Sequence, residues 1–401
     1  MGAGPAGASL ALRLCRAGQA VTLVEAAESL DRQFRGEALM PHGLEALEAM
    51  GLLPLASAIP QRRLRGWCFV LEKRELFRLI EPLETLPDAA ACTLISQPAL
   101  LRHWLAELRS LPGARVLLGR RAASLLLENG RVAGVRLDDG QTLTARLVVA
   151  ADGRASRLRQ QAGLPLRRLG DAIEVLWFRL EGHDPSPLQG CFTTVIGAGG
   201  LFSAFDSASG GVQLGWVPER EETSGDWAER LAALSPPALA AWLRDAAGAL
   251  REPVRLRVEV GQAERWWRPG LLLLGDAAHP MSPVRAQGIN LALRDACTAA
   301  EELLKALEGH KEEPQRLDGA LARIEACRRP ECDTIQKLQA EETRRGLLLR
   351  RQGWLRRALA LNAPWLGALV AERWRRQQLP LRLGVTNLRG GGSTAVAEAR
   401  R

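Results

Sequence analysis

The sequence predicts an α/β protein in which a domain with a parallel sheet is interrupted by an antiparallel β-sheet and followed by C-terminal helices. Three observations predict this fold: a GxGxxG loop that opens a helix at residue 5, a short apolar strand ending in Gly-Asp at residues 271–276, and short β-rich runs between about residues 172 and 264. Strands that alternate with helices are typical of a parallel sheet, and clustered short strands are typical of an antiparallel one.

The first motif comprises Gly2, Gly4 and Gly7, and a helix is expected over residues 5–17, stopped by Gly18. In such a loop the first glycine permits a tight turn, the second lets a pyrophosphate approach, and the third lets the helix lie close to the sheet. Glu25 ends the next apolar run, where an acid can bind an adenosine ribose hydroxyl. The spacing predicts a Rossmann-like dinucleotide site.

A Rossmann-like fold needs a strand before its first glycine, whereas here Met1 alone precedes Gly2. We therefore expect that the first strand is truncated in this sequence, and that the natural chain either begins upstream or has been shortened. Loss of a central strand is expected to weaken dinucleotide affinity and stability.

The second motif spans residues 271–295. An apolar run at residues 271–274 predicts a strand buried on both faces, with Gly275 and Asp276 at its carboxyl end, where ligands bind in open α/β sheets. Pro283 stiffens the following loop, and Gly288 lets the backbone approach a flat ligand. A helix opening at residues 288–290 presents free N–H groups that favour an electron-rich group.

A third motif lies between these two. A strand expected over residues 142–149 runs on to Asp152 and Gly153, and Ser156 is placed to cap the next helix. Another amphipathic helix begins at Gln97 and Pro98. The order GxGxxG, Asp-Gly, Gly-Asp is more specific than any one of the three motifs.

In this order the motifs resemble those of the flavin-dependent aromatic hydroxylases, the para-hydroxybenzoate hydroxylase-like FAD monooxygenases. The resemblance implies that Asp276 binds the ribityl chain of FAD, that Asp152 reaches toward its pyrophosphate and NAD(P)H, and that the loop at Pro283 and Gly288 faces the flavin. An arginine before a glycine contacts the pyrophosphate in the family; Arg35 matches it best and Arg32 competes. The implied FAD-binding residues are Gly2, Gly4, Gly7, Glu25, Arg35, Gln97, Asp152, Gly153, Gly275, Asp276, Pro283, Gly288, Ile289 and Asn290.

Plainer interpretations stand beside two of these residues. Arg35 or Arg32 is also consistent with a solvated loop cation, and Gln97 with an ordinary neighbour of a helix N-cap. No spacing in the β-rich segment singles out a catalytic side chain.

By resemblance, NAD(P)H reduces the flavin, O₂ adds to it, and a flavin C4a-hydroperoxide hydroxylates an aromatic, quinone-like or other apolar small molecule. Two alternatives remain: a flavin-dependent reductase of isoprenoid or quinone double bonds, and a flavin-binding protein without turnover. The absence of a second GxGxxG agrees with a class that has no separate NADPH domain.

The expected domain organisation follows the motifs. Residues 1–63, 90–170 and 265–330 form the FAD-binding domain, and residues 64–89 and 171–264 form an antiparallel substrate domain. Residues 331–387 form a C-terminal helical region, and residues 388–401 a disordered tail.

Composition excludes several classes. A hydrophobic fraction of 47% with 25% charged residues is ordinary for a soluble globular protein, and neither a membrane-length apolar run nor a secretory signal is present. Seven scattered cysteines indicate reduced thiols in the cytoplasm, and five histidines without ligand spacing indicate no metal site. The net charge of +9 favours anionic ligands, but no nucleic-acid motif occurs.

Residues 344–376 alternate basic pairs with Leu and Trp, which is consistent either with helices packed on the FAD-binding domain or with contact to a membrane surface.

Overall fold

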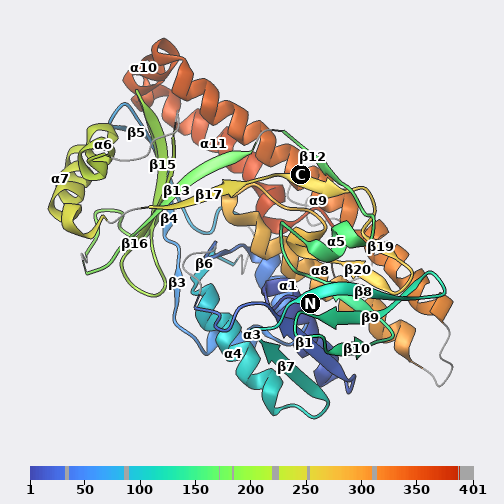
Figure 1. Ribbon diagram of the computed structural model, residues 1–401. Coiled ribbons are helices and arrows are strands. Elements are labelled where there is room, and N and C mark those ends of the chain that lie inside the picture. Colours follow the sequence, from blue (N-terminus) through green and yellow to red (C-terminus); the bar gives the residue numbers. More distant parts are fainter. Residues whose placement is uncertain are drawn as a thin grey trace.

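The computed structural model describes residues 1–31, 36–84, 90–170, 172–182, 185–218, 225–250, 253–308, 314–386 and 388. It has the expected α/β architecture: a parallel-stranded part with its helices, a larger mixed sheet beside it, and long C-terminal helices along both (Figure 1). None of the helices described is long and apolar enough to cross a membrane.

The parallel part consists of two strand pairs. β1 (Val21–Glu25) lies parallel to β7 (Ala114–Leu118), and β11 (Val148–Ala150) lies parallel to β20 (Leu271–Leu273), which also pairs with β19 (Trp267–Arg268).

The first two residues join these pairs. The Met1 amino group donates to the Val149 carbonyl at 2.8 Å, and the Gly2 N–H donates to the Val24 carbonyl at 2.7 Å. Met1 and Gly2 therefore lie between β1 and β11, in the position where the sequence predicts the first strand.

Helices cover one face of this sheet. α1 (Pro5–Arg16), α4 (Gln97–Ser110) and α8 (Gln287–Leu307) share one apolar core that includes the fully buried Leu12 and Trp104. The expected stop of α1 is confirmed, because Gly18 has a φ of +81° directly after the helix. Burial of such side chains contributes about 1.5 to 3 kcal/mol each, which fixes the helices that carry the glycine loop and the Gly-Asp motif.

One strand prediction is wrong. Residues 142–149 form two strands rather than one, because β10 (Thr142–Thr144) pairs antiparallel with β9 (Arg131–Leu137), whereas β11 turns away to pair with β20. β9 also pairs with β8 (Ala122–Glu128), so this segment forms a separate antiparallel sheet.

The larger, mixed sheet has seven strands in the order β17-β13-β16-β15-β14-β4-β5. It is antiparallel apart from β4 and β14, which run parallel because they come from two separate excursions of the chain, so the expectation of an all-antiparallel sheet is corrected there. Helices α6 and α7 cover one face around a core that includes Phe202 and Leu231. The bounds are β4 (Gly66–Leu71), β5 (Arg74–Ile80), β13 (Ile173–Leu180), β14 (Cys191–Gly197), β15 (Gly200–Asp206), β16 (Val212–Val217), β17 (Val254–Val258), α6 (Trp227–Leu234) and α7 (Pro237–Asp245).

The C-terminal helices belong to both parts of the molecule. α9 (Pro314–Arg351) packs on α8 and then reaches β14 and β15, while α10 (Gly353–Leu361) and α11 (Ala363–Leu383) pack on β4 and β5. The domain boundary expected at residue 330 therefore falls inside α9, which continues through Pro330. The expected tail, residues 388–401, lies outside the described residues apart from residue 388.

Short elements complete the structure. They are β2 (Ala38–Leu39), α2 (Pro41–Ala49), α3 (Leu53–Ser57), β3 (Gln61–Arg63), β6 (Thr93–Ile95), α5 (Arg157–Gln161), β12 (Leu166–Arg168), β18 (Gly261–Ala263), and the 3₁₀ turns η1 (Ala246–Ala249), η2 (Gly275–Ala277) and η3 (Val284–Ala286).

Candidate cofactor and substrate site

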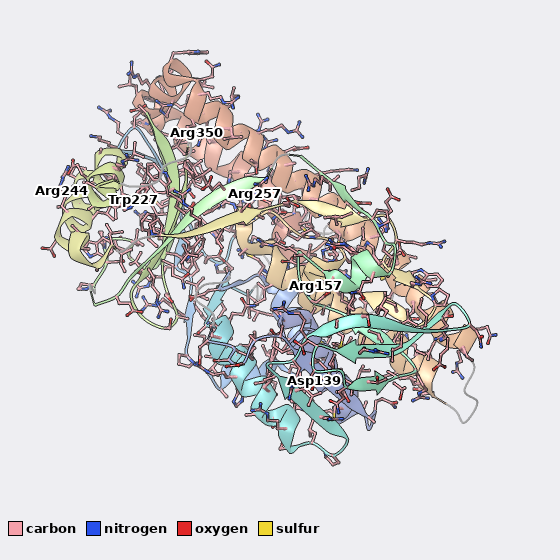
Figure 2. All side chains as sticks on the ribbon, viewed as in Figure 1. Asp139, Arg157, Trp227, Arg244, Arg257 and Arg350 are labelled. Carbon is pink, nitrogen blue, oxygen red and sulfur yellow. The ribbon has the colours of Figure 1, made fainter. Side chains whose placement is uncertain are left out.

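One cavity of about 940 Å³ runs from the glycine loop to the seven-stranded sheet. Its wall takes residues from the parallel part, from the mixed sheet and from helices α9 and α11. Figure 2 shows the separation of two of its lining residues, Arg157 at the start of α5 and Arg350 near the end of α9. This volume lies at the upper end of the range typical of ligand sites.

The three glycines of the loop have three different surroundings. Gly2 has a φ of +95°, and a Cβ there would lie 2.2 Å from the Ala151 carbonyl oxygen; a Cβ on Gly7 would lie 2.0 Å from the Gly2 oxygen. A Cβ on Gly4 would meet no atom of the described residues within 4 Å. The first and third glycines thus allow close contacts within the protein, while the second leaves open space at the N-terminus of α1. No side chain of the described residues caps that end, so its N–H groups can receive an anionic group.

Glu25 lies at the end of β1 and lines the cavity, although its side chain is buried. Its carboxylate accepts the N–H of Ala3 at 2.8 Å and the N–H of Ala27 at 2.9 Å. These two bonds orient the carboxylate at the end of β1.

Two buried acceptors beside the cavity have no hydrogen-bond donor among the described residues. Asp152 accepts the N–H of Arg157 at 3.0 Å through Oδ2, whereas within the described part of the chain its Oδ1 has no partner, and neither has Oε1 of Gln97. Both residues line the cavity. Buried polar atoms are nearly always paired in proteins, so these two oxygens fit a ligand with donor groups. Together with the open side of Gly4, they fit the hydroxyl groups and pyrophosphate of FAD.

Other residues of the third motif also have defined positions. The predicted cap is confirmed, because Ser156 Oγ accepts the Arg159 N–H at 3.0 Å. Gly153 has a φ of +84° and lines the cavity, with open space where its side chain would be. Gln97 is the first residue of α4, after the N-cap Ser96.

The Gly-Asp motif follows β20 and forms the turn η2. Asp276 is partly exposed to the cavity and accepts a hydrogen bond from Arg154 Nε at 3.1 Å. Gly275, with a φ of +58°, donates its N–H to the Asp295 carboxylate at 3.2 Å. The backbone before Asp276 is therefore anchored to α8, and the aspartate itself remains available to a ligand.

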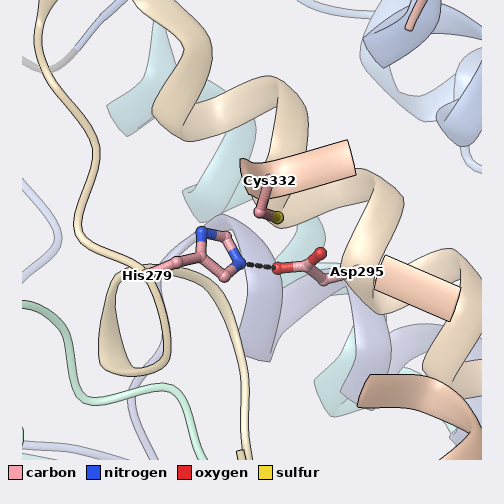
Figure 3. A group of neighbouring side chains, drawn as sticks. All are labelled: His279, Asp295 and Cys332. Carbon is pink, nitrogen blue, oxygen red and sulfur yellow. Dashed lines mark hydrogen bonds and ion pairs between the residues drawn. The ribbon is translucent and has the colours of Figure 1, made fainter. Parts of the chain in front are cut away.

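Behind this turn lies a buried polar cluster (Figure 3). His279 Nε2 lies 2.6 Å from Asp295 Oδ2, and the Cys332 thiol lies close to both. Arg328 donates to Asp295 Oδ1 at 2.9 Å and also pairs with Glu331. Both Asp295 oxygens thus already accept hydrogen bonds, which favours an ion-pair network over a cation site.

Electrostatics agree with a charged His279–Asp295 pair. Burial acts to lower the pKa of His279, but Cys332 and Asp295 outweigh it, so this pKa lies well above its ordinary value. Burial raises the pKa of Cys332, and His279 offsets part of that rise. The pKa of Asp295 is lowered, since His279 and Arg328 outweigh the effect of burial.

The loop after η2 carries an arginine that sequence reasoning missed. Arg285 and the following Ala286 have φ values of +58° and +49°, unusual for residues with side chains. The Arg285 guanidinium pairs with Glu342 of α9 at 2.7 Å and lies 4.8 Å from the ring centre of Trp374. No local sequence signal marks this contact, because its partners lie 57 and 89 positions away.

The flavin-facing residues expected from sequence differ in position. Pro283, Gly288 and Ile289 line the cavity. Asn290 is not among the lining residues: its Oδ1 accepts the Met40 N–H at 2.8 Å and its Nδ2 donates to Ala38 at 3.0 Å. Its side chain therefore fixes β2 and α2 to α8. Arg35 and Arg32 lie outside the described residues.

The far end of the cavity is mainly aromatic. Trp177, Phe192 and Phe205 of the mixed sheet face Trp374 of α11, and Phe192 stacks on Phe205 with 5.4 Å between ring centres. Glu37, buried at the edge of this chamber, accepts hydrogen bonds from Ser207 and Gln213. Burial raises its pKa, and the bonds from Ala208 and Ser207 offset part of that rise. Such a chamber suits a flat apolar ring with few polar substituents.

Comparison with known proteins gives consistent findings. The sequence model of the family described as "FAD binding domain" matches residues 1–326. A 6-methylpretetramide 4-monooxygenase of Streptomyces rimosus is 36% identical over 357 residues, which cover 86% of this chain and 82% of that protein. The crystal structure of PqsL from P. aeruginosa in complex with 2-aminobenzoylacetate has a TM-score of 0.73 at 25% identity, covering 90% of this chain and 96% of that one. A digeranylgeranylglycerophospholipid reductase of Methanopyrus kandleri is 28% identical over 328 residues, which cover 77% of this chain and 80% of that protein.

Proposed function

This chain belongs to the FAD binding domain family, and we propose that it is an FAD-dependent monooxygenase that takes electrons from NAD(P)H and hydroxylates an aromatic or quinone-like ring. The observation that carries the proposal is a continuous cavity of about 940 Å³, which joins the glycine loop and the Gly-Asp motif to an aromatic chamber. Such a cavity can hold a dinucleotide cofactor at one end and an apolar substrate at the other.

Each part of the cavity has a role in this proposal. The N-terminus of α1 and Gly4 receive the pyrophosphate, Glu25 accepts a ribose hydroxyl, and Asp276 accepts hydroxyls of the ribityl chain. The backbone of Pro283 and Gly288 would hold the flavin ring. Bound there, FAD supplies electron transfer from NAD(P)H and the activation of O₂. The surrounding apolar walls exclude water, which limits side reactions during turnover.

The chamber also supports a substrate class. Trp177, Phe205 and Trp374 offer ring faces, while Glu37 with its hydrogen-bonded partners offers a carboxyl group at one edge. A flat, largely apolar ring system with phenolic or carbonyl groups suits these walls. The Streptomyces relative is named for its substrate, 6-methylpretetramide, and the PqsL structure contains 2-aminobenzoylacetate. Both names support the same class of substrate. We include peripheral contact with a membrane surface through the C-terminal helices in the proposal.

A direct test measures NADH and NADPH oxidation and O₂ consumption by the FAD-loaded protein with 6-methylpretetramide and with 2-aminobenzoylacetate as probes. We expect at least one probe to accelerate both rates together and to yield a hydroxylated product. NAD(P)H oxidation that saturates a double bond without O₂ uptake would instead support a reductase, the activity named for the Methanopyrus relative. NAD(P)H oxidation no faster than with free FAD would contradict both the monooxygenase and the reductase activity.

A further inference from the structure

The end of the molecule formed by α10 and the start of α11 is covered with exposed apolar side chains. Trp365 is 85% exposed, Trp354 71% and Leu369 70%, with Leu361 at 64% on the same helical hairpin. Figure 1 shows α10 projecting at the end of the molecule remote from the parallel strands. Soluble proteins rarely leave two tryptophans this open on one small surface, which marks a contact site.

This surface is also strongly basic. Between Glu342 and Glu372 the sequence contains no acidic residue and six arginines, namely Arg344, Arg345, Arg350, Arg351, Arg356 and Arg357. Arg356 is buried and pairs with Glu72, whereas Arg351 and Arg357 are exposed. Lys73 and Arg74, exposed in the neighbouring β4–β5 turn, add two more cations. Tryptophan beside arginine is typical of protein surfaces that enter the headgroup region of anionic lipid.

The exposed surface continues into the wall of the cavity. Trp365, Leu369 and Arg373 follow one another at intervals of four residues on α11, so they lie along one stripe of the helix. Arg373 lines the cavity, as do Val370 and Arg350. A molecule held at the exposed end of the stripe is therefore close to the aromatic chamber.

We propose that the α10–α11 tip, defined as Trp354, Leu361, Trp365 and Leu369 with Arg351 and Arg357, docks on the surface of an anionic phospholipid bilayer. The two indoles lie in the interface and the arginines contact lipid phosphates. Docking places the cavity wall next to lipid, so a membrane-dissolved apolar substrate can reach it; this second step rests on the proposed function. A symmetric contact with a second copy would bring the arginines of both copies together, which charge repulsion opposes.

The experiment measures binding of the full-length, FAD-loaded protein to vesicles by co-sedimentation. One set of vesicles is pure phosphatidylcholine and the other is a mixture of phosphatidylcholine and phosphatidylglycerol. We expect binding to the mixed vesicles that weakens in high salt. Trp354→Ala/Trp365→Ala should lower the partition coefficient more than about tenfold, because both indoles lose their interfacial contacts. Arg351→Gln/Arg357→Gln should lower it by about 25-fold on mixed vesicles only, at roughly fivefold per arginine.

Two control variants test whether the loss of any two exposed arginines, or of any exposed apolar side chain, lowers vesicle binding. Arg16→Gln/Arg102→Gln removes two exposed arginines from the parallel part, and Leu127→Ala removes an exposed leucine from β8, 55% exposed. Both should bind vesicles like the parent protein. Flavin absorbance and melting temperature confirm that each variant is folded.

Binding to neither vesicle type overturns the proposal, and so does equal loss in the tip and control variants. A concentration-dependent dimer that Trp354→Ala/Trp365→Ala dissociates would assign the tip to a second copy instead. The measurement needs no turnover, so it can fail while the proposed monooxygenase activity holds, and the reverse.

Discussion

Replacing Asp295 with Asn tests the buried network that anchors the Gly-Asp motif. Asp295 is fully buried, and its two oxygens accept from Arg328 Nε at 2.9 Å and from His279 Nε2 at 2.6 Å. An amide offers only one acceptor, so Asn turns an N–H₂ group toward one of these donors and leaves a buried charge unpaired. Removing one partner of a buried ion pair costs about 3 to 5 kcal/mol.

Thermal unfolding monitored by circular dichroism measures this loss. Asp295→Asn should lower the melting temperature by about 6 to 20 °C, at roughly 2 to 4 °C per kcal/mol. Asp139→Asn is the control, because Asp139 pairs with Arg120 at the surface, where an ion pair contributes about 0 to 1 kcal/mol. If the unfolding free energies of the two variants differ by less than about 1 kcal/mol, the network does not anchor the motif.

Three further predictions concern the cofactor and pH. Asp276→Ala should weaken FAD binding about ten- to a hundredfold in a fluorescence titration, because charge-assisted hydrogen bonds contribute about 1.5 to 3 kcal/mol each, and unchanged affinity would refute its role. Glu25→Ala should weaken FAD more than FMN, which lacks the adenosine ribose; equal losses would place Glu25 elsewhere. The pKa of His42 is lowered to about 3, chiefly by burial and then by Arg294. The unfolded chain therefore binds a proton below pH ~6.5 before the folded one does, and stability falls by about 2 kcal/mol by pH 5. His42→Phe should flatten this slope in denaturant titrations, and an unchanged slope would contradict the assignment.

Local chemistry made part of the site predictable. The close contact of Gly7 with the Gly2 oxygen arises within the motif itself, and the Ser156 cap is a contact over three positions. The burial of the strand before Gly275 likewise follows from its apolar run. These features depend on neighbours in sequence, which a single chain reveals.

Other features depend on distant neighbours. The ring stack on Arg285 needs Trp67 and Trp374, which come from a strand and a helix at opposite ends of the chain. The parallel pairing of β4 with β14 joins residues 125 positions apart in the sequence, such as Gly66 and Cys191. The Asn290 side chain occupies space that Gly43 leaves open, because a Cβ on Gly43 would lie 2.1 Å from Asn290 Oδ1, and these two residues are far apart in the sequence. Only the folded structure shows which distant residues these side chains contact.

The central claim is that this cavity holds FAD and delivers one oxygen atom from O₂ to an aromatic ring. The most direct measurement incubates the FAD-loaded protein with NAD(P)H, isotopically labelled O₂ and a panel of phenols and quinones, and analyses the products by mass spectrometry. The account predicts a product that carries one labelled oxygen atom, and its loss in Asp276→Ala along with the flavin. If the FAD-loaded protein forms a product that carries no label, or whose new oxygen comes from water, this account is contradicted.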